Sequence, residues 1–353
     1  MLKKTRQLII GLTITLGALY YTLHNISLDE LIESFKGVHY FYLVPATVFI
    51  ILSFIFRIFR WQILLSPVRK IPLFGLFSPM MVGYMGNILP ARAGDIFRPY
   101  LISQRYEVPF SSSIATIVLE RLFDVLGLLV IFIWCFIFYS DLFNSGAMVS
   151  GVSVETLAVK FGELATLVLC IILVLIYFLL YQEQRFLRGV HAFSRHLPAR
   201  WHDKVEFVVQ EFRLGVVILK SFPALIKIVL FTALEWLANI FSMYPLYWAY
   251  ELENKTLGSL LILTVMIAIF VTILPTPALL GAFNAGVLVA LHEIMHESEL
   301  AAVGFGMVGY GLNFLVIFLG GFYFVLHDHL SLSQLMKTEV TRELELKRLE
   351  HEN

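Results

Sequence analysis

The sequence predicts an all-α polytopic membrane protein, on the basis of its composition, the length of its apolar runs and two runs interrupted by proline and glycine. Hydrophobic residues make up 59% of the 353 residues, charged residues only 15%, and the mean hydropathy is +0.81. A soluble domain needs about 25% charged residues to cover its surface. The formal net charge is +0. Nucleic-acid-binding proteins carry an excess of lysine and arginine, so we expect no nucleic-acid partner.

The apolar runs predict about six full transmembrane helices and two broken or re-entrant hairpins, which would make eight crossings if the hairpins span. A run must be long enough to cross roughly 30 Å of hydrocarbon. The first run lacks a small-residue cleavage site, so we interpret it as a retained helix. The continuous runs are Leu8 to Leu23, Phe41 to Leu65, Ser111 to Tyr139, Phe161 to Tyr181, Phe222 to Tyr250 and Val303 to Leu326; the interrupted runs are Ile71 to Leu89 and Leu257 to His292.

The distribution of lysine and arginine predicts the orientation, because cytoplasmic loops accumulate these residues. The connector Gln182 to Ser221 is rich in arginine and lysine, whereas the connector Asp141 to Lys160 holds only Lys160. We therefore expect the first connector and both termini on the cytoplasmic side of the cytoplasmic (inner) membrane. The basic connector is either an amphipathic helix on the inner leaflet or an ordinary loop.

The domain organisation is predicted as one transmembrane domain over residues 1–330 and a cytoplasmic polar tail over 331–353. Residues 41–139 and 222–326 each comprise a crossing, an interrupted run containing Ile-Leu-Pro, and a second crossing, with opposite predicted directions. This is the pattern of an inverted repeat, in which paired broken helices place a substrate site near the midplane. The alternative is that a short motif recurs by chance in an apolar chain.

The end of the first interrupted run and the residues that follow it hold the strongest candidate site. Pro90 removes a backbone donor and Gly94 tolerates unusual torsions, so we expect the helix to break there. Free backbone at membrane depth is tolerated inside protein or in a wet cavity, and arginine grips phosphate bidentately. The alternative is that these arginines only snorkel to the interface. The residues expected to line this cavity are Asn87, Arg92, Asp95 and Arg98.

The next apolar run carries Glu120, Arg121 and Asp124, with the two acids four residues apart on one helix face. If the helix starts near Ser111, Glu120 lies about 13 Å along it, close to the midplane. The acids either contact substrate or serve as counterions of the arginines. Glu235 lies deep in its run without a sequence-local base, which indicates a functional or proton-linked role. Arg57 and Arg60 are second-rank candidates, because arginines near a helix end commonly snorkel.

The second interrupted run is expected to form an opposing gate at Pro275, Pro277 and Gly281, followed by Asn284. The neighbours His292 and Glu293 are too few for a metal site. Cys135 and Cys170 lie inside apolar runs, where we expect neither a disulfide nor metal binding. We expect no cofactor, no metal and no catalytic residues.

The series Asn87-x-Leu89-Pro90-x-Arg92-x-Gly94-Asp95-x-x-Arg98, the serines Ser111 to Ser113 and the series Glu120-Arg121-x-x-Asp124 resemble the flippase-like membrane domain of lysylphosphatidylglycerol synthases and of many stand-alone proteins. The second motif of that family is usually Pro-x-Pro-Gly-Gly-x-Gly-x-x-Glu. Here Pro275, Pro277 and Gly281 match it, whereas Ala278, Leu279 and Asn284 replace two glycines and the acid.

The resemblance implies a flippase-like transporter that moves polar lipids between leaflets. Because Arg92 and Arg98 would hold an anionic headgroup, we expect the substrate to be an anionic lipid or lipid-linked headgroup. The alternative is a non-transporting membrane scaffold or accessory subunit of a lipid or glycan synthase. Membrane segments occupy most of the 353 residues, so an enzymatic role would need a lipid-modifying enzyme as a partner chain.

Overall fold

The computed structural model describes residues 35–88, 94–139, 148–149, 151–182, 216–274 and 279–330, together with Asp29, Ile32 and Leu214. In this part of the chain, 5 helices are long and apolar enough to cross a membrane. They are η1 with α3 (Tyr40–Tyr42, Leu43–Leu65), α6 (Phe110–Phe138), α8 (Val154–Tyr181), α11 (Phe222–Ala249) and α14 (Glu299–His327). The predicted all-α polytopic fold is confirmed. The first apolar run, most of the basic connector and the tail 331–353 lie outside the described residues.

Two spanning helices begin earlier than their apolar runs because serine caps them. Ser153 precedes α8 and its hydroxyl accepts a hydrogen bond from the Thr156 amide at 3.2 Å. Ser298 precedes α14 and accepts from the Ala301 amide, also at 3.2 Å. Each cap satisfies an amide that the helix leaves free. The connector before α8 also forms a two-residue antiparallel ladder of β1 (Met148–Val149) and β2 (Val152–Ser153).

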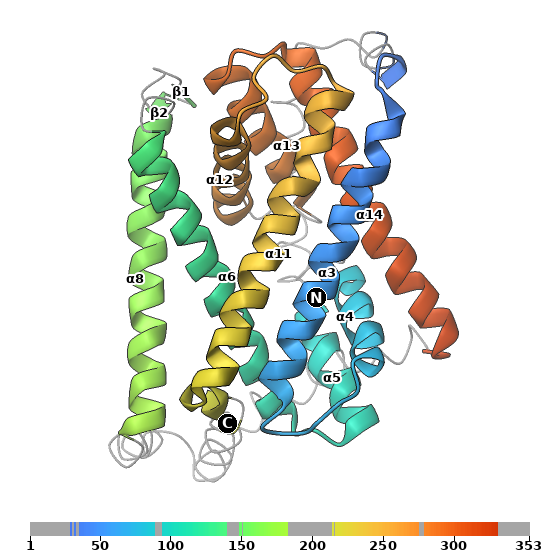
Figure 1. The fold of residues 1–353 in the computed structure, drawn as a ribbon, viewed down its shortest axis with the longest axis vertical. Coiled ribbons are helices and arrows are strands. Elements are labelled where there is room, and N and C mark those ends of the chain that lie inside the picture. Colours follow the sequence, from blue (N-terminus) through green and yellow to red (C-terminus); the bar gives the residue numbers. More distant parts are fainter. Residues whose placement is uncertain are drawn as a thin grey trace, which may run out of the picture.

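The first interrupted run and the residues that follow it form a re-entrant hairpin of α4 (Phe74–Gly86) and α5 (Gly94–Tyr106). Each helix has 13 residues, about 20 Å by the rise per residue, which is too short to cross the hydrocarbon. Gly75 at the start of α4 lies against the Tyr106 ring at the end of α5, and Gly83 lies against Gly94 near the tip. The two helices are therefore antiparallel and return to one side (Figure 1).

The second interrupted run forms a hairpin of α12 (Leu257–Ile273) and α13 (Leu280–Leu288), which continues as the π-helix η5 (Val289–Ile294). The Asn254 amide before α12 donates to Glu297 Oε1 after η5 at 2.9 Å, so this hairpin also closes on itself. It enters from the opposite end of the molecule (Figure 1). The tips, residues 89–93 and 275–278, lie outside the described residues, so the predicted approach of the tips stays a prediction.

The helices before and after each hairpin have the order and directions that the predicted repeat requires. Helix α3, the α4–α5 hairpin and α6 form one unit, and α11, the α12–α13 hairpin and α14 form the other (Figure 1). Helix α3 runs antiparallel to α11, and α6 runs antiparallel to α14, in the view of Figure 1. The common origin of the two units stays a prediction.

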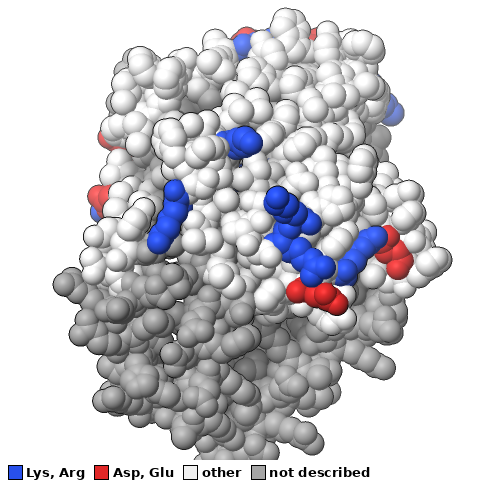
Figure 2. Space-filling view, turned by 60° about the horizontal axis from the view of Figure 1, so that its bottom comes forward, with Lys and Arg blue, Asp and Glu red and all other residues white. Residues whose placement is uncertain are grey.

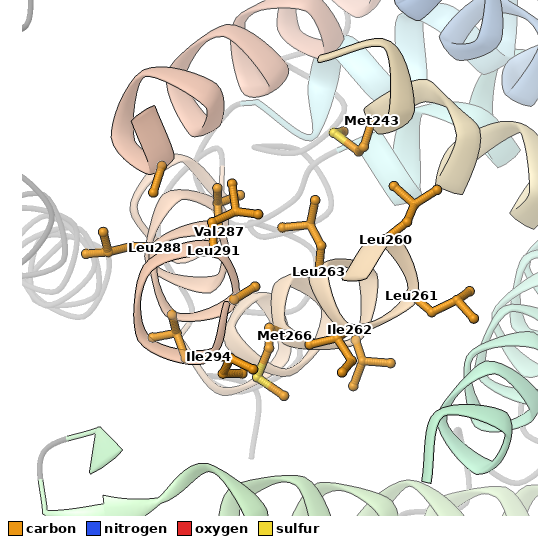
Figure 3. Close-up of a cluster of buried hydrophobic side chains, with 14 of the residues drawn as sticks. Met243, Leu260, Leu261, Ile262, Leu263, Met266, Val287, Leu288, Leu291 and Ile294 are labelled. Carbon is orange, nitrogen blue, oxygen red and sulfur yellow. The ribbon is translucent and has the colours of Figure 1, made fainter. Parts of the chain in front are cut away.

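The apolar core divides into two main clusters, one at each end of the bundle. The cluster around the second hairpin joins α12, α13 and η5 to α11 and α14, and includes Met243, Leu263 and Met266 (Figure 3). The cluster around the first hairpin includes Trp61, Met80 and Leu119 from α3, α4 and α6. The second of these clusters borders the charged residues.

Candidate functional site

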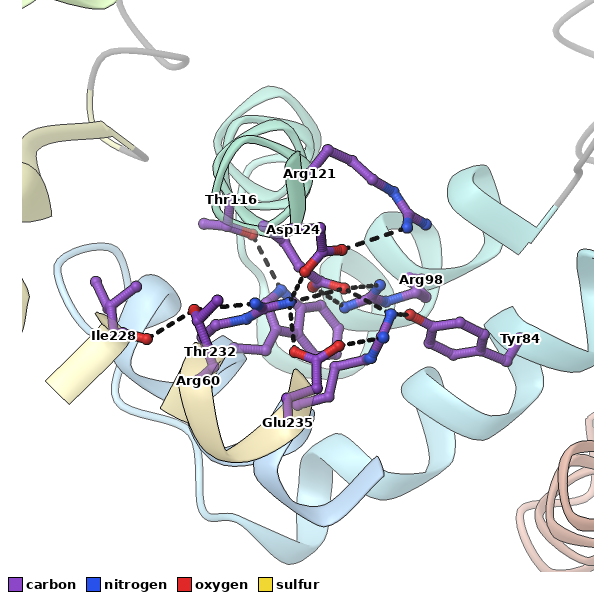
Figure 4. A network of polar contacts seen from close by, with 12 residues as sticks. Arg60, Tyr84, Arg98, Thr116, Arg121, Asp124, Ile228, Thr232 and Glu235 are labelled. Atoms are coloured by element: carbon purple, nitrogen blue, oxygen red, sulfur yellow. Dashed lines mark hydrogen bonds and ion pairs between the residues drawn. The ribbon is translucent and has the colours of Figure 1, made fainter. Parts of the chain in front are cut away.

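Charged side chains from four helices gather beside the first hairpin (Figure 4). Helix α3 supplies two arginines, α5 an arginine and an aspartate, α6 three charged residues and α11 one glutamate. Four cations and four carboxylates thus form one ion cluster, which comprises Arg57, Arg60, Asp95, Arg98, Glu120, Arg121, Asp124 and Glu235. Within the described residues this ion cluster has no net formal charge.

Arg98 and Glu120 form a bidentate pair at the centre of the ion cluster. Arg98 Nη1 donates to Glu120 Oε1 at 3.1 Å and Nη2 donates to Oε2 at 2.7 Å. The Arg98 side chain is 1% exposed and the Glu120 side chain is fully buried. The Arg98 guanidinium also lies 4.3 Å from the Trp61 ring centroid, a cation–π contact. Glu120 is thus paired with an arginine of the first motif, as the counterion alternative expects.

Glycine in α4 makes room for Arg98. A Cβ at Gly83 would lie 2.8 Å from Arg98 Cδ and closer still to Cγ, so only a residue without a side chain fits there. Gly94 needs to be small for a related reason, because a Cβ there would overlap the Gly83 carbonyl. Gly94 does not have a positive φ. The helix does break between Gly86 and Gly94, where α4 ends and α5 begins, but Gly94 has no unusual torsion there and instead permits close packing.

Arg60 connects three helices. Its Nη2 lies 2.6 Å from Asp124 Oδ1 on α6 and 2.9 Å from Glu235 Oε2 on α11, and its Nη1 donates to Thr232 Oγ1 at 3.1 Å. The Arg60 side chain is fully buried. Burying a charge is tolerated when it is paired and hydrogen-bonded. The expectation that Arg60 snorkels to the interface is therefore wrong.

Arg57 lies one helical turn before Arg60 on the same face of α3. It donates hydrogen bonds to the Tyr84 hydroxyl on α4 and to Glu235 Oε1, and its Nη1 lies 3.8 Å from Glu120 Oε1. Glu235 therefore has two arginine partners, although none is near it in the sequence. Sequence reasoning ranked Arg57 and Arg60 too low and missed Tyr84. Their spacing of three residues on an otherwise apolar helix is the signal that could have indicated a shared internal face.

The outer layer of the ion cluster lies between α5 and α6. Arg121 Nη2 donates to Asp95 Oδ1 at 3.2 Å, and Arg121 Nη1 lies 3.6 Å from Asp124 Oδ2. Asn87, which follows α4, donates to Asp95 Oδ1 at 3.2 Å and ties the two helices together near the tip. The Arg121 and Asp95 side chains are 44% and 37% exposed. This layer is the accessible part of the ion cluster.

The structure brings together most of the residues that the sequence predicted to bind substrate. Asn87, Asp95, Arg98, Glu120, Arg121, Asp124 and Glu235 are brought together as expected. Arg92, Pro90, Pro275 and Pro277 lie outside the described residues, so their roles stay predictions. Asp124 contacts Arg60 of α3 and Arg121 of its own helix, and its nearest cation is Arg60.

The second hairpin contributes no charge to this site, since residues 257–291 contain no acidic, lysine or arginine side chain. Asn284 is 4% exposed, and its Nδ2 donates to the Leu280 carbonyl of its own helix at 2.8 Å. Gly281 is buried in the first turn of α13. Leu279 precedes the helix in the left-handed region, with φ 64°. A leucine therefore occupies a conformation that favours glycine.

A separate ion pair joins α5 to α14 at the open end of the first hairpin. Arg105 Nη1 lies 2.9 Å from Asp328 Oδ2, and His327 Nδ1 lies 2.8 Å from Asp328 Oδ1. Partial burial disfavours the ionised Asp328, but hydrogen bonds from Ser78 and His327 and the charge of Arg105 outweigh it, so the pKa of Asp328 is lowered. This pair holds the hairpin against the last spanning helix.

Comparisons with known proteins agree with this architecture. Over 121 residues the chain is 29% identical to a protein of Haloferax volcanii described as "Glycosyltransferase AglD", a match that covers 34% of this chain and 19% of that protein. The chain thus spans only a small part of the length of this relative. No solved structure gave a significant match. The model of the family described as "Lysylphosphatidylglycerol synthase TM region" matches residues 8–321. The chain therefore belongs to the lysylphosphatidylglycerol synthase transmembrane-region family.

Proposed function

We propose that this protein moves a polar lipid headgroup from one leaflet of the membrane to the other, with the ion cluster as the place where the headgroup crosses the hydrocarbon. The observation that carries the proposal is the graded exposure of the ion cluster at membrane depth. Arg60 and Glu120 are fully buried, Arg57 and Asp124 are 14% and 17% exposed, and Arg121 is 44% exposed. Charges within a membrane span mark substrate pathways when they face the protein interior or a wet cavity.

The depth of the ion cluster suits this role. Glu120 is the eleventh residue of α6 and Glu235 the fourteenth of α11, which places them about 15 and 20 Å from the starts of those helices. Both helices start at the same end of the bundle (Figure 1). A headgroup at these residues would thus be near the middle of a hydrocarbon layer of about 30 Å, with its acyl chains remaining in lipid.

We test the proposal with the purified protein in liposomes that contain a trace of acyl-labelled fluorescent phospholipid. A membrane-impermeant quencher then reports how quickly inner-leaflet lipid becomes accessible. The informative variant is Arg57→Gln with Glu235→Gln, which removes a cation and an anion together and leaves no net charge. The matched control is Lys160→Gln with Glu163→Gln, an exposed pair 2.8 Å apart on α8.

We expect the protein and the control to accelerate lipid movement, and the ion-cluster variant to be slower by about tenfold or more, the equivalent of about 1.4 kcal/mol. An ion-cluster variant that is folded and as fast as the control would contradict the proposal. So would a protein that moves no phospholipid faster than empty liposomes do. That second result favours a scaffold for a lipid or glycan synthase, a role consistent with the partial similarity to a glycosyltransferase.

We also propose that the first hairpin opens to the cytoplasm. The end of the bundle that holds the start of α11 and the end of α5 exposes the basic residues Arg69, Lys70, Arg105, Lys220 and Lys227. Several basic side chains are visible on that end (Figure 2). Short cytoplasmic loops are enriched in such residues.

Single cysteines in a background without Cys135 and Cys170 test this orientation. Ser221 at the start of α11 and Glu253 before α12 are both exposed and lie at opposite ends of the bundle. In intact cells we expect an impermeant thiol reagent to label Glu253→Cys and not Ser221→Cys. The reverse labelling pattern would invert the proposed orientation.

A further inference from the structure

Two asparagines lie beyond the ion cluster, inside spanning helices. Asn239 follows Glu235 by four residues on the same face of α11, and Asn313 is the fifteenth of the 29 residues of α14. Asparagine side chains in spanning helices commonly hydrogen-bond to a neighbouring helix. Within the described residues, however, neither of these two side-chain amides has a hydrogen-bond partner. Both amides are therefore available to a ligand.

Asn239 points into the bundle and yet remains accessible. Glu235, Ser242 and Met243 lie on the same face of α11, and all three are buried. Leu237 is exposed, and it lies two residues before Asn239, on the other side of the helix. Asn239 itself is only half-buried. Its accessible surface therefore borders a space inside the bundle and not the lipid.

Asn313 has the same kind of position on α14. Gly306 and Gly309, which precede it by seven and four residues on that face, are buried against Asn284 of α13 and against α11. Leu315, two residues after Asn313 and on the other side of the helix, is exposed. Asn313 is half-buried. It too has accessible surface on the inward face of its helix.

The two amides lie at the same level of the membrane. A Cβ at Gly309 would lie 3.4 Å from Met243 Sδ, so α14 and α11 are in contact there. The two helices run in opposite directions (Figure 1). Asn313 follows Gly309 by four residues and Asn239 precedes Met243 by four, so both lie about 6 Å from this contact, toward the ion cluster. They therefore border one space between α11 and α14, one helical turn past Glu235.

The helices on this side of the ion cluster carry no charged residue. Residues 236–249 of α11, 257–291 of the second hairpin and 300–326 of α14 contain no acidic residue, lysine, arginine or histidine. A side-chain amide provides two donors and an acceptor. These helices therefore offer a headgroup hydrogen bonds and not ion pairs.

Asn284 shows how a structural amide is satisfied in the same region. It is buried, and its Nδ2 donates to the Leu280 carbonyl of its own helix at 2.8 Å. Asn239 and Asn313 have no such bond and keep accessible surface. A polar group without a partner is unfavourable in an apolar environment. Water or a polar ligand beside these two amides removes that cost.

We infer that Asn239 and Asn313 form a second binding site for the lipid headgroup, between α11 and α14, which the headgroup enters after it leaves the ion cluster. The ligand is a phosphate ester that binds through its oxygen atoms, by hydrogen bonds and whatever the net charge of the headgroup. This inference rests on the proposed lipid movement and adds the second part of the route, toward the leaflet opposite the first hairpin.

The first test uses Asn239→Leu and Asn313→Leu in the liposome assay with labelled phospholipid. Leucine has a similar size to asparagine and makes no hydrogen bond. The matched control is Thr264→Val on α12, which also removes a polar group from a membrane segment; its Oγ1 donates to the Leu260 carbonyl of its own helix at 2.9 Å. Thermal unfolding in detergent is measured for all three variants.

We expect each leucine variant to move lipid more slowly than the control by about tenfold or more, because a hydrogen bond to a charged phosphate is lost. Their unfolding temperatures should be no lower than that of the wild-type protein, since each change removes an unpaired amide. Slow lipid movement together with a lower unfolding temperature would indicate a structural role and contradict the inference.

The second test is independent of lipid movement and uses single cysteines in a background without Cys135 and Cys170. Asn313→Cys is compared with Leu315→Cys, its lipid-facing neighbour on α14, in liposomes treated with a small hydrophilic methanethiosulfonate reagent. Thiols react as thiolates, which form in water and not in hydrocarbon, so Asn313→Cys should react faster by about tenfold or more. Equal reaction rates would contradict a polar space on the inward face of α14.

The outcomes separate this inference from the proposed function. A wild-type protein that moves lipid, together with leucine variants that are as fast as Thr264→Val, contradicts the second site and leaves the lipid movement intact. A wild-type protein that moves no lipid contradicts both.

Discussion

Neutralising Glu120 while Arg98 keeps its charge is expected to destabilise the protein more than any surface change of the same kind. Arg98 is 1% exposed and makes two hydrogen bonds to Glu120, at 3.1 and 2.7 Å. In Glu120→Gln one acceptor oxygen becomes an amide NH₂ group, so a donor faces a donor and the Arg98 charge loses its nearest anion. Removing one member of a buried ion pair costs about 3 to 5 kcal/mol.

The geometry supports the upper part of that range. Arg57 and Arg60 lie 3.8 and 4.0 Å from Glu120 Oε1, so the same change removes an anion shared by three arginines. The assay is equilibrium unfolding in mixed detergent micelles, followed by circular dichroism. Glu163→Gln is the matched control, because its partner Lys160 is 70% exposed; we expect a loss of less than about 1 kcal/mol there.

The double variant of Glu120→Gln with Arg98→Gln distinguishes a lost contact from an orphaned charge. Replacing both members of a buried pair by neutral residues is often close to neutral in stability, and the rest of the ion cluster stays balanced. We expect recovery to within about 2 kcal/mol of wild type and a coupling of the order of 2 kcal/mol or more. A double variant that is less stable than Glu120→Gln alone would refute the counterion role of Glu120.

Three further changes follow from local geometry and are measured by thermal unfolding in detergent. Gly83→Ala should destabilise the protein by about 1 to 3 kcal/mol, because the added methyl group displaces the aliphatic part of the Arg98 side chain. The control Gly311→Ala has no atom within 4 Å of its Cβ position and should leave the stability unchanged. Equal melting temperatures of the two variants would contradict the packing argument. Leu279→Gly should stabilise the protein by about 1 kcal/mol, because the φ of 64° at this position is left-handed and favours glycine. A loss of stability in this variant would contradict the argument from backbone strain. Asp328→Asn should lower the free energy of unfolding by up to about 1 kcal/mol at pH 7. Because the pKa of Asp328 is lowered, this contribution is complete above about pH 4 and disappears as the pH falls through the lowered pKa. A difference in stability between variant and wild type that persists in stronger acid would exclude the ion pair as its source.

The order of helices could be derived from the sequence because each element depends on its own residues. Long apolar runs predict the spanning helices, and the runs interrupted by proline and glycine predict the hairpins. In the first hairpin each helix has 13 residues, too few to cross the hydrocarbon. The starts of α8 and α14 were missed by several residues. Serine caps, which hydropathy ignores, determine those ends.

The membership of the ion cluster could be predicted only in part. Arg98 and Glu120 are 22 residues apart, and their pairing could be expected because motif and acid lie in adjacent runs. Arg57 and Glu235 are 178 residues apart, and nothing local to either residue indicates the other. An arginine near a helix end has the same sequence pattern whether it snorkels or turns inward.

The sequence by itself determined that this is a membrane protein with two hairpins, where its charges stand along the chain and which family it resembles, because hydrophobicity and helix-breaking residues act locally. Only the tertiary structure decided which charges meet, that Arg57 and Arg60 face inward, and that Arg121 and Asp95 form the accessible layer while Arg98 and Glu120 are buried. The physical reason is that a charge within the membrane must find a partner, and the partner is determined by which helices pack together. Here α3 packs against α11 and α5 against α6, and those contacts bring the four cations and four carboxylates into one site.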